Sequence, residues 1–506
     1  MSDVRGPGRP VGRRTLIATT AALALGMTLG ACTDGDRGDD QLRTDVADGA
    51  PASMVLPGED AAQTALTLSA LLFAASDVVV VASSETAESL AAVSSTARLP
   101  LLIGTDQAVL DEIARLGAGT VVTAAGTDLT GLGEDLEVVE IDPADATATL
   151  PEVVADPTPT TVRLLVDPDQ PAPAAAIARA QIEAAGGTVG EVSGGDPRRS
   201  SDTVAAAKEA AGEDPATGVI ALGGSFGATE QWIAALQAAV TVPELPGGGQ
   251  VAFPHRRMVA AYGTPGAPAL GILGEQGLEE SIARVQQLAA EYQEFSAEPV
   301  IPAFEVITTI ASAEAGRDGD YSRPIDPGEL RPWVDAAGEA GVYVVLDLQP
   351  GTTDFLTQAK LYEELLKEPH VGLALDPEWR LKPGQRHMVQ IGSVSAQEVN
   401  ETSQWLADLT AEHSLPQKVF ILHQFNLSMI SDRQDVDTSR PELAITLHAD
   451  GHGNPGDKLA TWNALQRDLP EGIFMAWKNF YDEDSPTFTP QETYELEPKP
   501  WFVSYQ

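Results

Sequence analysis

The C-terminal half of this chain is constrained above all by a regular alternation of apolar strands and amphipathic helices. Eight strands are expected, at residues 258–262, 300–305, 342–349, 371–376, 419–424, 443–450, 473–478 and 501–505. Amphipathic helices are expected in most connections, at residues 278–295, 326–340, 355–366, 396–412 and 457–469. Continuous apolar strands separated by helices indicate a parallel sheet covered on both faces. Eight such strands predict a (β/α)8 barrel over residues 255–506.

The N-terminal half shows the same alternation with less regularity. Apolar strands are expected at residues 77–81, 101–103, 120–122, 162–166 and 219–222, with Ala- and Leu-rich helical stretches between them. We therefore predict a parallel α/β domain of Rossmann-like type over residues 52–248. The Pro- and Gly-rich residues 240–254 have the composition of a linker to the barrel.

One stretch of this half carries a recognisable pattern. The sequence SDVVVVASSETAESLAAVSSTARLPLLIGTDQAVLDEIARLGAGTVVTAAGTD, within residues 70–130, resembles the cell-wall-binding repeat 2 family. The resemblance implies a domain that binds anionic polymers of the cell wall, so a cell-wall polysaccharide is the expected partner.

The N-terminus has the features of an export signal. Four arginines, Arg5, Arg9, Arg13 and Arg14, precede an uncharged run over residues 15–31. Such a pattern predicts a signal peptide over residues 1–31. The following Leu-Gly-Ala-Cys resembles a bacterial lipobox, which implies that Cys32 is lipidated and anchors the protein to the outer face of the cell membrane. Arg13-Arg14-Thr15-Leu16-Ile17 resembles a twin-arginine signal, and the general and the twin-arginine export routes both stay open.

Composition excludes several other classes of protein. The chain has 31 Lys and Arg against 74 Asp and Glu, a formal net charge of −43, and a single cysteine. A chain with this negative charge repels the phosphate backbone of a nucleic acid. Nucleic acid is therefore not an expected partner. One cysteine cannot form an intramolecular disulfide or a thiolate zinc cluster, and no phosphate-binding glycine motif is present, so no cofactor is expected. Residues 32–51 are polar and charged, which predicts a disordered linker.

Strand periodicity predicts which barrel residues point inward. In the strand at 371–376, Leu373 and Leu375 are expected to face the helices, while Ala374, Asp376 and Glu378 share the inward side. The same parity places polar residues at the C-terminal ends of six strands: Glu305, Asp347, Gln349, Asp376, Glu378, His423, His448, Asp450 and Lys478. Catalytic residues of such barrels gather at this end. Because buried charges are costly unless paired or used, we predict a polar site there.

Carboxyl groups dominate this set, which favours glycoside hydrolysis. That reaction needs one protonated carboxyl and one ionised carboxyl, and crowding like charges raises the pKa of at least one group. Asp376-Pro377-Glu378-Trp379 resembles the D-x-E of chitinase-like barrels, which implies Glu378 as the acid. We expect Glu378 to be the general acid, Asp376 to orient it, and Asp450 to be the nucleophile or base.

Further residues are expected to bind the sugar. The polar groups expected to hold hydroxyls are Glu305, Asp347, Gln349, His423, His448 and Lys478. Trp379 is expected to stack on a sugar ring and Tyr481 to wall the mouth.

Two alternatives stay open. His448, Asp450 and His452 could hold a metal ion and activate water, as in a deacetylase or amidohydrolase. The barrel could instead be a non-catalytic cell-wall-binding module. The whole pattern resembles actinobacterial surface lipoproteins whose barrel has no assigned reaction.

Overall fold

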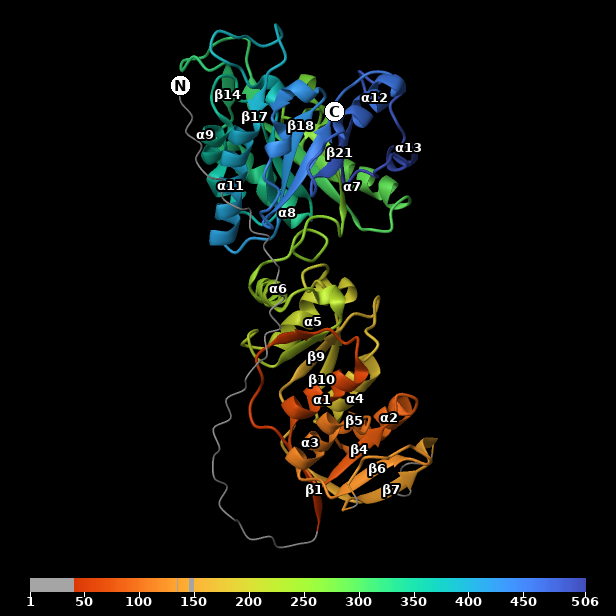
Figure 1. The fold of residues 1–506 in the computed structure, drawn as a ribbon. Helices are drawn as coiled ribbons and strands as arrows, with labels where there is room; N and C mark the ends of the chain where they lie inside the picture. The colour runs from red at the N-terminus through yellow and green to blue at the C-terminus, as the bar shows by residue number, and fades with distance from the viewer. Residues whose placement is uncertain (1–40, 134, 145–149) are drawn as a thin grey trace, which may run out of the picture. The chain divides into compact units, whose positions relative to one another are not determined.

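The fold is that of a computed structural model that describes residues 41–133, 135–144 and 150–506 (Figure 1). The expected signal peptide, the expected lipidation site Cys32 and most of the expected linker lie outside the described residues. Among the helices of the described ranges, none is both long and apolar enough to cross a membrane.

The N-terminal part contains two four-stranded parallel sheets. One has the order β5-β4-β6-β7, built from β4 (Val78–Ala82), β5 (Leu101–Ile103), β6 (Thr120–Ala124) and β7 (Glu137–Ile141). The other has the order β10-β9-β11-β2, built from β2 (Met54–Leu56), β9 (Arg163–Val166), β10 (Thr188–Glu191) and β11 (Val219–Leu222). The predicted parallel α/β character of this half is confirmed.

Six helices accompany these sheets: α1 (Ala61–Leu72), α2 (Ala87–Ala97), α3 (Gln107–Leu116), α4 (Ala175–Ala184), α5 (Ser201–Ala211) and α6 (Thr229–Thr241). Their apolar faces pack on strands such as β4, whose five residues are all buried. Strands covered on both faces explain the uninterrupted runs of valine in the sequence.

A third, smaller sheet includes residues that we expected to be disordered. β1 (Leu42–Val46) pairs in parallel with β8 (Val153–Ala155) and antiparallel with β3 (Phe73–Ser76). It lies inside residues 32–51, which we expected to be disordered. The polar composition of that segment did not reveal the strand because its partners come from distant parts of the sequence.

The C-terminal part is a closed barrel of eight parallel strands. They are β12 (Arg257–Gly263), β13 (Val300–Ala311), β15 (Tyr343–Leu348), β16 (Val371–Leu375), β18 (Lys418–Gln424), β20 (Leu443–Ala449), β21 (Phe474–Asn479) and β22 (Phe502–Tyr505). The barrel closes because β12 pairs with β13 on one side and with β22 on the other. All eight expected strands are present. β13 continues to Ala311 because the short β14 (Ser322–Pro324) pairs with its end.

Helices fill six of the seven connections between barrel strands. They are α7 (Leu278–Gln293), α8 (Pro327–Glu339), α9 (Phe355–Ala359), α10 (Glu363–Leu366), α11 (Ala396–Glu412), α12 (Pro455–Leu465) and α13 (Pro490–Tyr494). The expected helix at 355–366 is divided into α9 and α10 by a 3-10 turn at Lys360–Tyr362. The connection from β18 to β20 has no α-helix; it holds 3-10 turns and β19 (Ile430–Ser431), which pairs with β17 (Val394–Ser395).

The alternation of side chains along the strands is as predicted. Leu373 and Leu375 belong to the core between strands and helices, whereas Ala374 belongs to the core inside the barrel. Small inward residues leave room for Tyr343, whose ring is fully buried in that interior. Gly372 is required beside it, because a Cβ there would collide with the backbone carbonyl oxygen of Val419 and would lie 2.8 Å from the Tyr343 hydroxyl. This packed lower half leaves the upper half for polar side chains.

Candidate functional site

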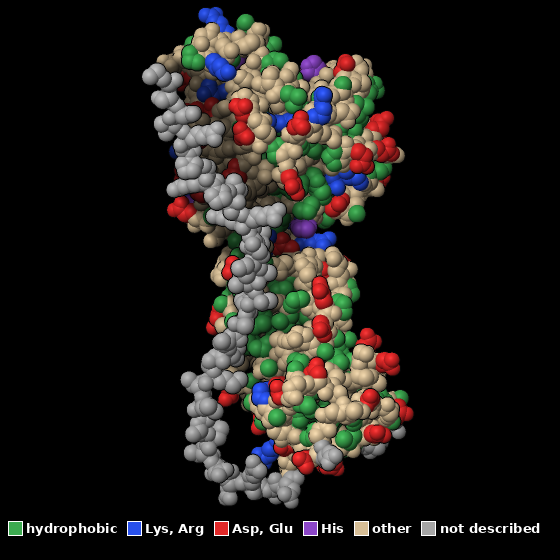
Figure 2. Space-filling view, in the orientation of Figure 1, with side chains coloured by type: hydrophobic (Ala, Val, Ile, Leu, Met, Phe, Trp, Pro, Cys, Tyr) green, Lys and Arg blue, Asp and Glu red, His purple; other side chains and the backbone are tan. Residues whose placement is uncertain are grey.

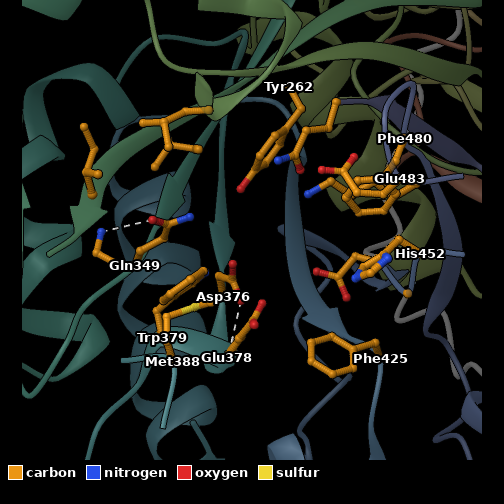
Figure 3. A pocket seen from close by; sticks show the side chains of 18 of the residues that line it. Tyr262, Gln349, Asp376, Glu378, Trp379, Met388, Phe425, His452, Phe480 and Glu483 are labelled. Carbon is orange, nitrogen blue, oxygen red and sulfur yellow. Dashed lines mark hydrogen bonds between the residues drawn. The ribbon is translucent and has the colours of Figure 1, made fainter. Parts of the chain in front are cut away.

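A cavity of about 550 Å³ opens at the C-terminal ends of the barrel strands (Figure 3). Polar residues that line it include Tyr262, Gln349, Asp376, Glu378, Asp450, His452, Lys478 and Glu483. Asp376, Glu378 and Trp379 lie on one side in Figure 3, and His452, Phe480 and Glu483 lie on the other. The three expected catalytic carboxyls therefore share one cavity, together with Gln349, Trp379 and Lys478 of the expected sugar-binding set.

Four other expected sugar-binding residues lie elsewhere. Glu305, Asp347, His423 and His448 are fully buried and are not part of the cavity lining. Inward side chains two positions apart on a strand occupy successive layers of a barrel. Asp347 is therefore one layer below Gln349, and these four residues form the layer beneath the cavity rather than its wall.

His423 connects this lower layer to the cavity. Its Nε2 lies 2.8 Å from Oε1 of Glu305, and its Nδ1 lies 3.0 Å from Oδ2 of Asp450. Because both ring nitrogens face carboxylates, both carry protons. Burial alone would lower the pKa of His423, but Glu305 and Asp450 raise it well above the ordinary value. His423 is thus a buried imidazolium that bridges two carboxylates.

The imidazolium keeps both of its partners ionised. Burial by itself raises the pKa of a carboxyl, but His448 and His423 hold the pKa of Glu305 far below its usual range. Burial likewise raises the pKa of Asp450, but the hydrogen bond and charge of His423, together with the charges of Lys478 and His448, lower it below its ordinary value. The other oxygen of Asp450, Oδ1, is buried and has no hydrogen-bond partner among the described residues. Asp450 therefore presents an ionised carboxylate at the cavity.

The carboxyls on the opposite side behave differently. Burial, and then the charge of Asp450, raise the pKa of Glu378 to about 7. Burial also raises the pKa of Asp376 well above its ordinary value, with further contributions from Asp347, Asp450 and Glu378. Asp376 Oδ1 accepts a hydrogen bond of 3.1 Å from the backbone N–H of Glu378, which fixes the turn that carries Glu378. One cavity thus holds carboxyls whose pKa values are raised and one whose pKa is lowered.

Two residues of this site, Tyr262 and Ser504, were not predicted from the sequence. The Tyr262 hydroxyl donates a 2.8 Å hydrogen bond to Asp347 Oδ2, and Lys478 Nζ lies 3.5 Å from the centre of the Tyr262 ring. Burial and Glu305 raise the pKa of Asp347 to about 6. Ser504 Oγ lies 3.2 Å from His448 Nε2. Both side chains point into the barrel according to strand periodicity. They were missed because the prediction selected inward residues by their charge, and neither tyrosine nor serine is charged.

The loop after β21 is held by a buried ion pair. Lys458 Nζ lies 2.6 Å from Asp484 Oδ2, which also accepts a hydrogen bond from the N–H of Phe480. Asp484 Oδ1 accepts a hydrogen bond of 2.9 Å from the N–H of Gly453, next to His452. Asp484 therefore joins the two loops that bring His452 and Glu483 to the cavity.

Tyr481 does not wall the mouth as expected. Its side chain is 44% exposed, its ring centre lies 5.2 Å from that of Tyr505, and it is absent from the cavity lining. The chain turns after β21, so Phe480 and Glu483 face the cavity in its place.

The residues do not fit the alternative metal centre. His448, Asp450 and His452 are not brought together; in the described ranges, the barrel groups with donor atoms within 4.8 Å of one another are Glu305, His423, His448 and Asp376, His423, Asp450. His423 belongs to both groups, and its Nε2 and Nδ1 lie 2.8 Å from Glu305 and 3.0 Å from Asp450. A metal ion in either group would have to displace a proton and a hydrogen bond of this ring.

Comparisons with known proteins add little to this description. No family model matches the chain, and no curated protein matches it. Cwp6 from Clostridium difficile is similar to this chain in structure with a TM-score of 0.30 and 11% sequence identity, covering 58% of this chain. The match spans 63% of the length of Cwp6. At this TM-score the similarity supports no argument about fold family or activity.

Proposed function

We propose that the C-terminal region is a (β/α)8 glycoside hydrolase whose general acid is Glu378 and whose ionised partner is Asp450. The observation that carries the proposal is that the pKa values of these two groups are shifted in opposite directions in one cavity. Glu378, with a pKa of about 7, can protonate the leaving oxygen near neutral pH. Asp450, kept ionised by His423, can act as nucleophile or base on the other side of the sugar.

The remaining lining residues have supporting roles in this proposal. Asp376, whose pKa is raised by burial, orients Glu378 through the backbone hydrogen bond. Trp379 offers an apolar surface for a sugar ring, and Gln349 and Lys478 offer polar groups for hydroxyls. The four buried residues beneath the cavity set charge and position rather than contact the substrate.

The test is the release of reducing ends from isolated cell-wall polysaccharide. Glu378→Gln and Asp450→Asn should each reduce the rate by about 10²-fold or more, because each removes one of the two required carboxyl functions. Glu412→Gln, at an exposed position at the end of α11, is the matched control and should be as active as the wild type.

Two outcomes would lead to the alternatives. If no protein releases reducing ends from any wall fraction but the wild type binds the polysaccharide, the barrel is a non-catalytic binding module. If activity is lost on chelation and restored by a divalent ion, the carboxyl mechanism is wrong.

We further propose that the protein is a lipoprotein of the cell envelope, anchored at Cys32 and held to the wall by its N-terminal α/β region. The lipobox-like sequence and the resemblance to cell-wall-binding repeat 2 support this proposal. Labelled palmitate should be incorporated into the wild type and not into Cys32→Ala, which should leave the membrane fraction. Equal labelling of both proteins would contradict the anchor.

A further inference from the structure

One loop at the mouth of the cavity exposes large apolar side chains. It covers residues 380–393, between the turn that carries Glu378 and β17. Met388 is 87% exposed, Val389 76% and Ile391 44%. Pairing of β17 with β19 brings this loop beside the loop of Leu427, which is 45% exposed. Adjacent exposed apolar residues of this size indicate a contact surface for a partner.

The same loop is basic in a strongly acidic protein. Residues 380–393 contain Arg380, Lys382 and Arg386 and no Asp or Glu, whereas the whole chain has 74 acidic against 31 basic residues. Arg380 is paired with Glu398 at 2.8 Å. Lys382 and Arg386 are exposed, and neither has a carboxylate within 4.0 Å in the described part of the chain. Figure 2 shows several Lys and Arg side chains at this end of the barrel, near β14 and β17.

The base of the loop is fixed, so its apolar tip is held outward. The N–H of Gly392 donates a 2.8 Å hydrogen bond to the carbonyl of Glu378. His387 Nε2 lies 2.9 Å from the carbonyl oxygen of Tyr321, and its ring centre lies 5.3 Å from that of Trp379. Met388 also lines the cavity. The exposed surface is therefore continuous with the cavity entrance.

We propose that this loop, together with Leu427, docks the cavity entrance on the surface of a membrane that contains anionic lipids. Apolar side chains flanked by unpaired cations are the combination that inserts at a bilayer interface, since the side chains enter the acyl boundary and the cations contact lipid phosphates. Repulsion between the lipid phosphates and the surrounding acidic surface is largely screened beyond a Debye length of about 8 Å, so the charges of the loop that touches the membrane dominate the interaction. Charge complementarity thus favours an anionic surface over a neutral glycan, and the exposed Met388, Val389 and Ile391 favour the acyl region of a bilayer over an acidic protein surface. The inference does not depend on the proposed hydrolase activity.

The experiment uses single-cysteine labelling of the full chain. Cys32 is the only cysteine, so Cys32→Ser followed by Val389→Cys allows an environment-sensitive fluorophore to be attached at the loop. The matched control is Leu361→Cys, which replaces another exposed apolar residue, 49% exposed, between α9 and α10. Both proteins are mixed with vesicles of phosphatidylcholine alone or with phosphatidylglycerol added, with and without a quencher in the acyl region.

The expected result is a blue shift and acyl quenching at position 389 in the anionic vesicles, and none at position 361. Lys382→Glu with Arg386→Glu in the labelled protein should weaken binding to the anionic vesicles by about 30-fold or more, since each cation near such a surface contributes about 1 kcal/mol. No spectral change at 389, an equal change at 361, or equal insertion in neutral vesicles would each overturn the proposal. Insertion unaffected by the two charge reversals would also overturn it.

Discussion

Glu378 allows a test of the site that needs no substrate. Its pKa is raised from an ordinary 4.5 to about 7 by burial and by Asp450, so the folded state disfavours its ionisation. Below the pKa that Glu378 has in the unfolded chain, its carboxyl is protonated in both the folded and the unfolded state, and it does not reduce the free energy of unfolding. As the pH rises towards 7 the unfolded chain releases its proton first, which lowers the stability of the folded state, and above 7 the cost stays constant. Glu378→Gln removes this cost, so the variant should be the more stable protein at alkaline pH.

The magnitude follows from the pKa. A rise from 4.5 to about 7 corresponds to about 3 kcal/mol at about 1.4 kcal/mol per pKa unit. Because Glu378 is only partly buried, we discount this to about 2 kcal/mol for solvent screening. For a region of this size, about 2 kcal/mol shifts the melting temperature by about 5 °C.

The assay is thermal unfolding of wild type and Glu378→Gln across a pH series from acidic to alkaline. The difference in Tm should be smallest below the ordinary pKa of a glutamate, grow through the neutral range and become constant above it. Glu412→Gln is the control for removing a carboxylate from the surface. A difference between wild type and Glu378→Gln that does not change with pH, or that favours the wild type at alkaline pH, would refute the raised pKa and with it the assignment of the acid.

Three further predictions test the network and the barrel. His423→Ala leaves two buried carboxylates without their shared partner and should cost about 3–5 kcal/mol in denaturant unfolding, and a loss below about 1 kcal/mol would contradict the bridge. Asp484→Asn and Lys458→Met should each lower the free energy of unfolding by a similar amount. In a double-mutant cycle the double variant should lose less than the sum of the two single losses. Strictly additive losses would show that the pair is not coupled. Gly372→Ala places a methyl group against Tyr343 and should destabilise the barrel by about 2 kcal/mol, so an unchanged Tm would mean that the barrel interior is less tightly packed than the structure indicates.

Local geometry explains why much of the barrel could be predicted. A strand turns successive side chains to opposite faces, so the sequence alone assigns Leu373 and Leu375 to the outer core and Asp376 to the inner side, and the outer-core assignment is confirmed. The order of strand and helix, and the gathering of strand ends at one mouth, follow from the same periodicity. These features depend only on neighbouring residues.

The alternation of side chains along a strand does not predict at which height in the barrel an inward residue lies, or which residues it contacts. Glu305 and His423 are 118 positions apart, yet they meet at 2.8 Å, and this contact makes His423 an imidazolium rather than a sugar ligand. Likewise the sequence places Tyr481 close to the mouth, but the turn after β21 directs its side chain away from the cavity and towards Tyr505.

The sequence by itself determined the kind and number of barrel strands and the face on which each carboxyl lies, because those depend on the backbone and on nearest neighbours. Only the tertiary structure decided which carboxyl is protonated. The pKa of a buried group is set by desolvation and by charges a few ångströms away, and for Glu378 and Asp450 those charges come from strands that only the closed barrel brings together.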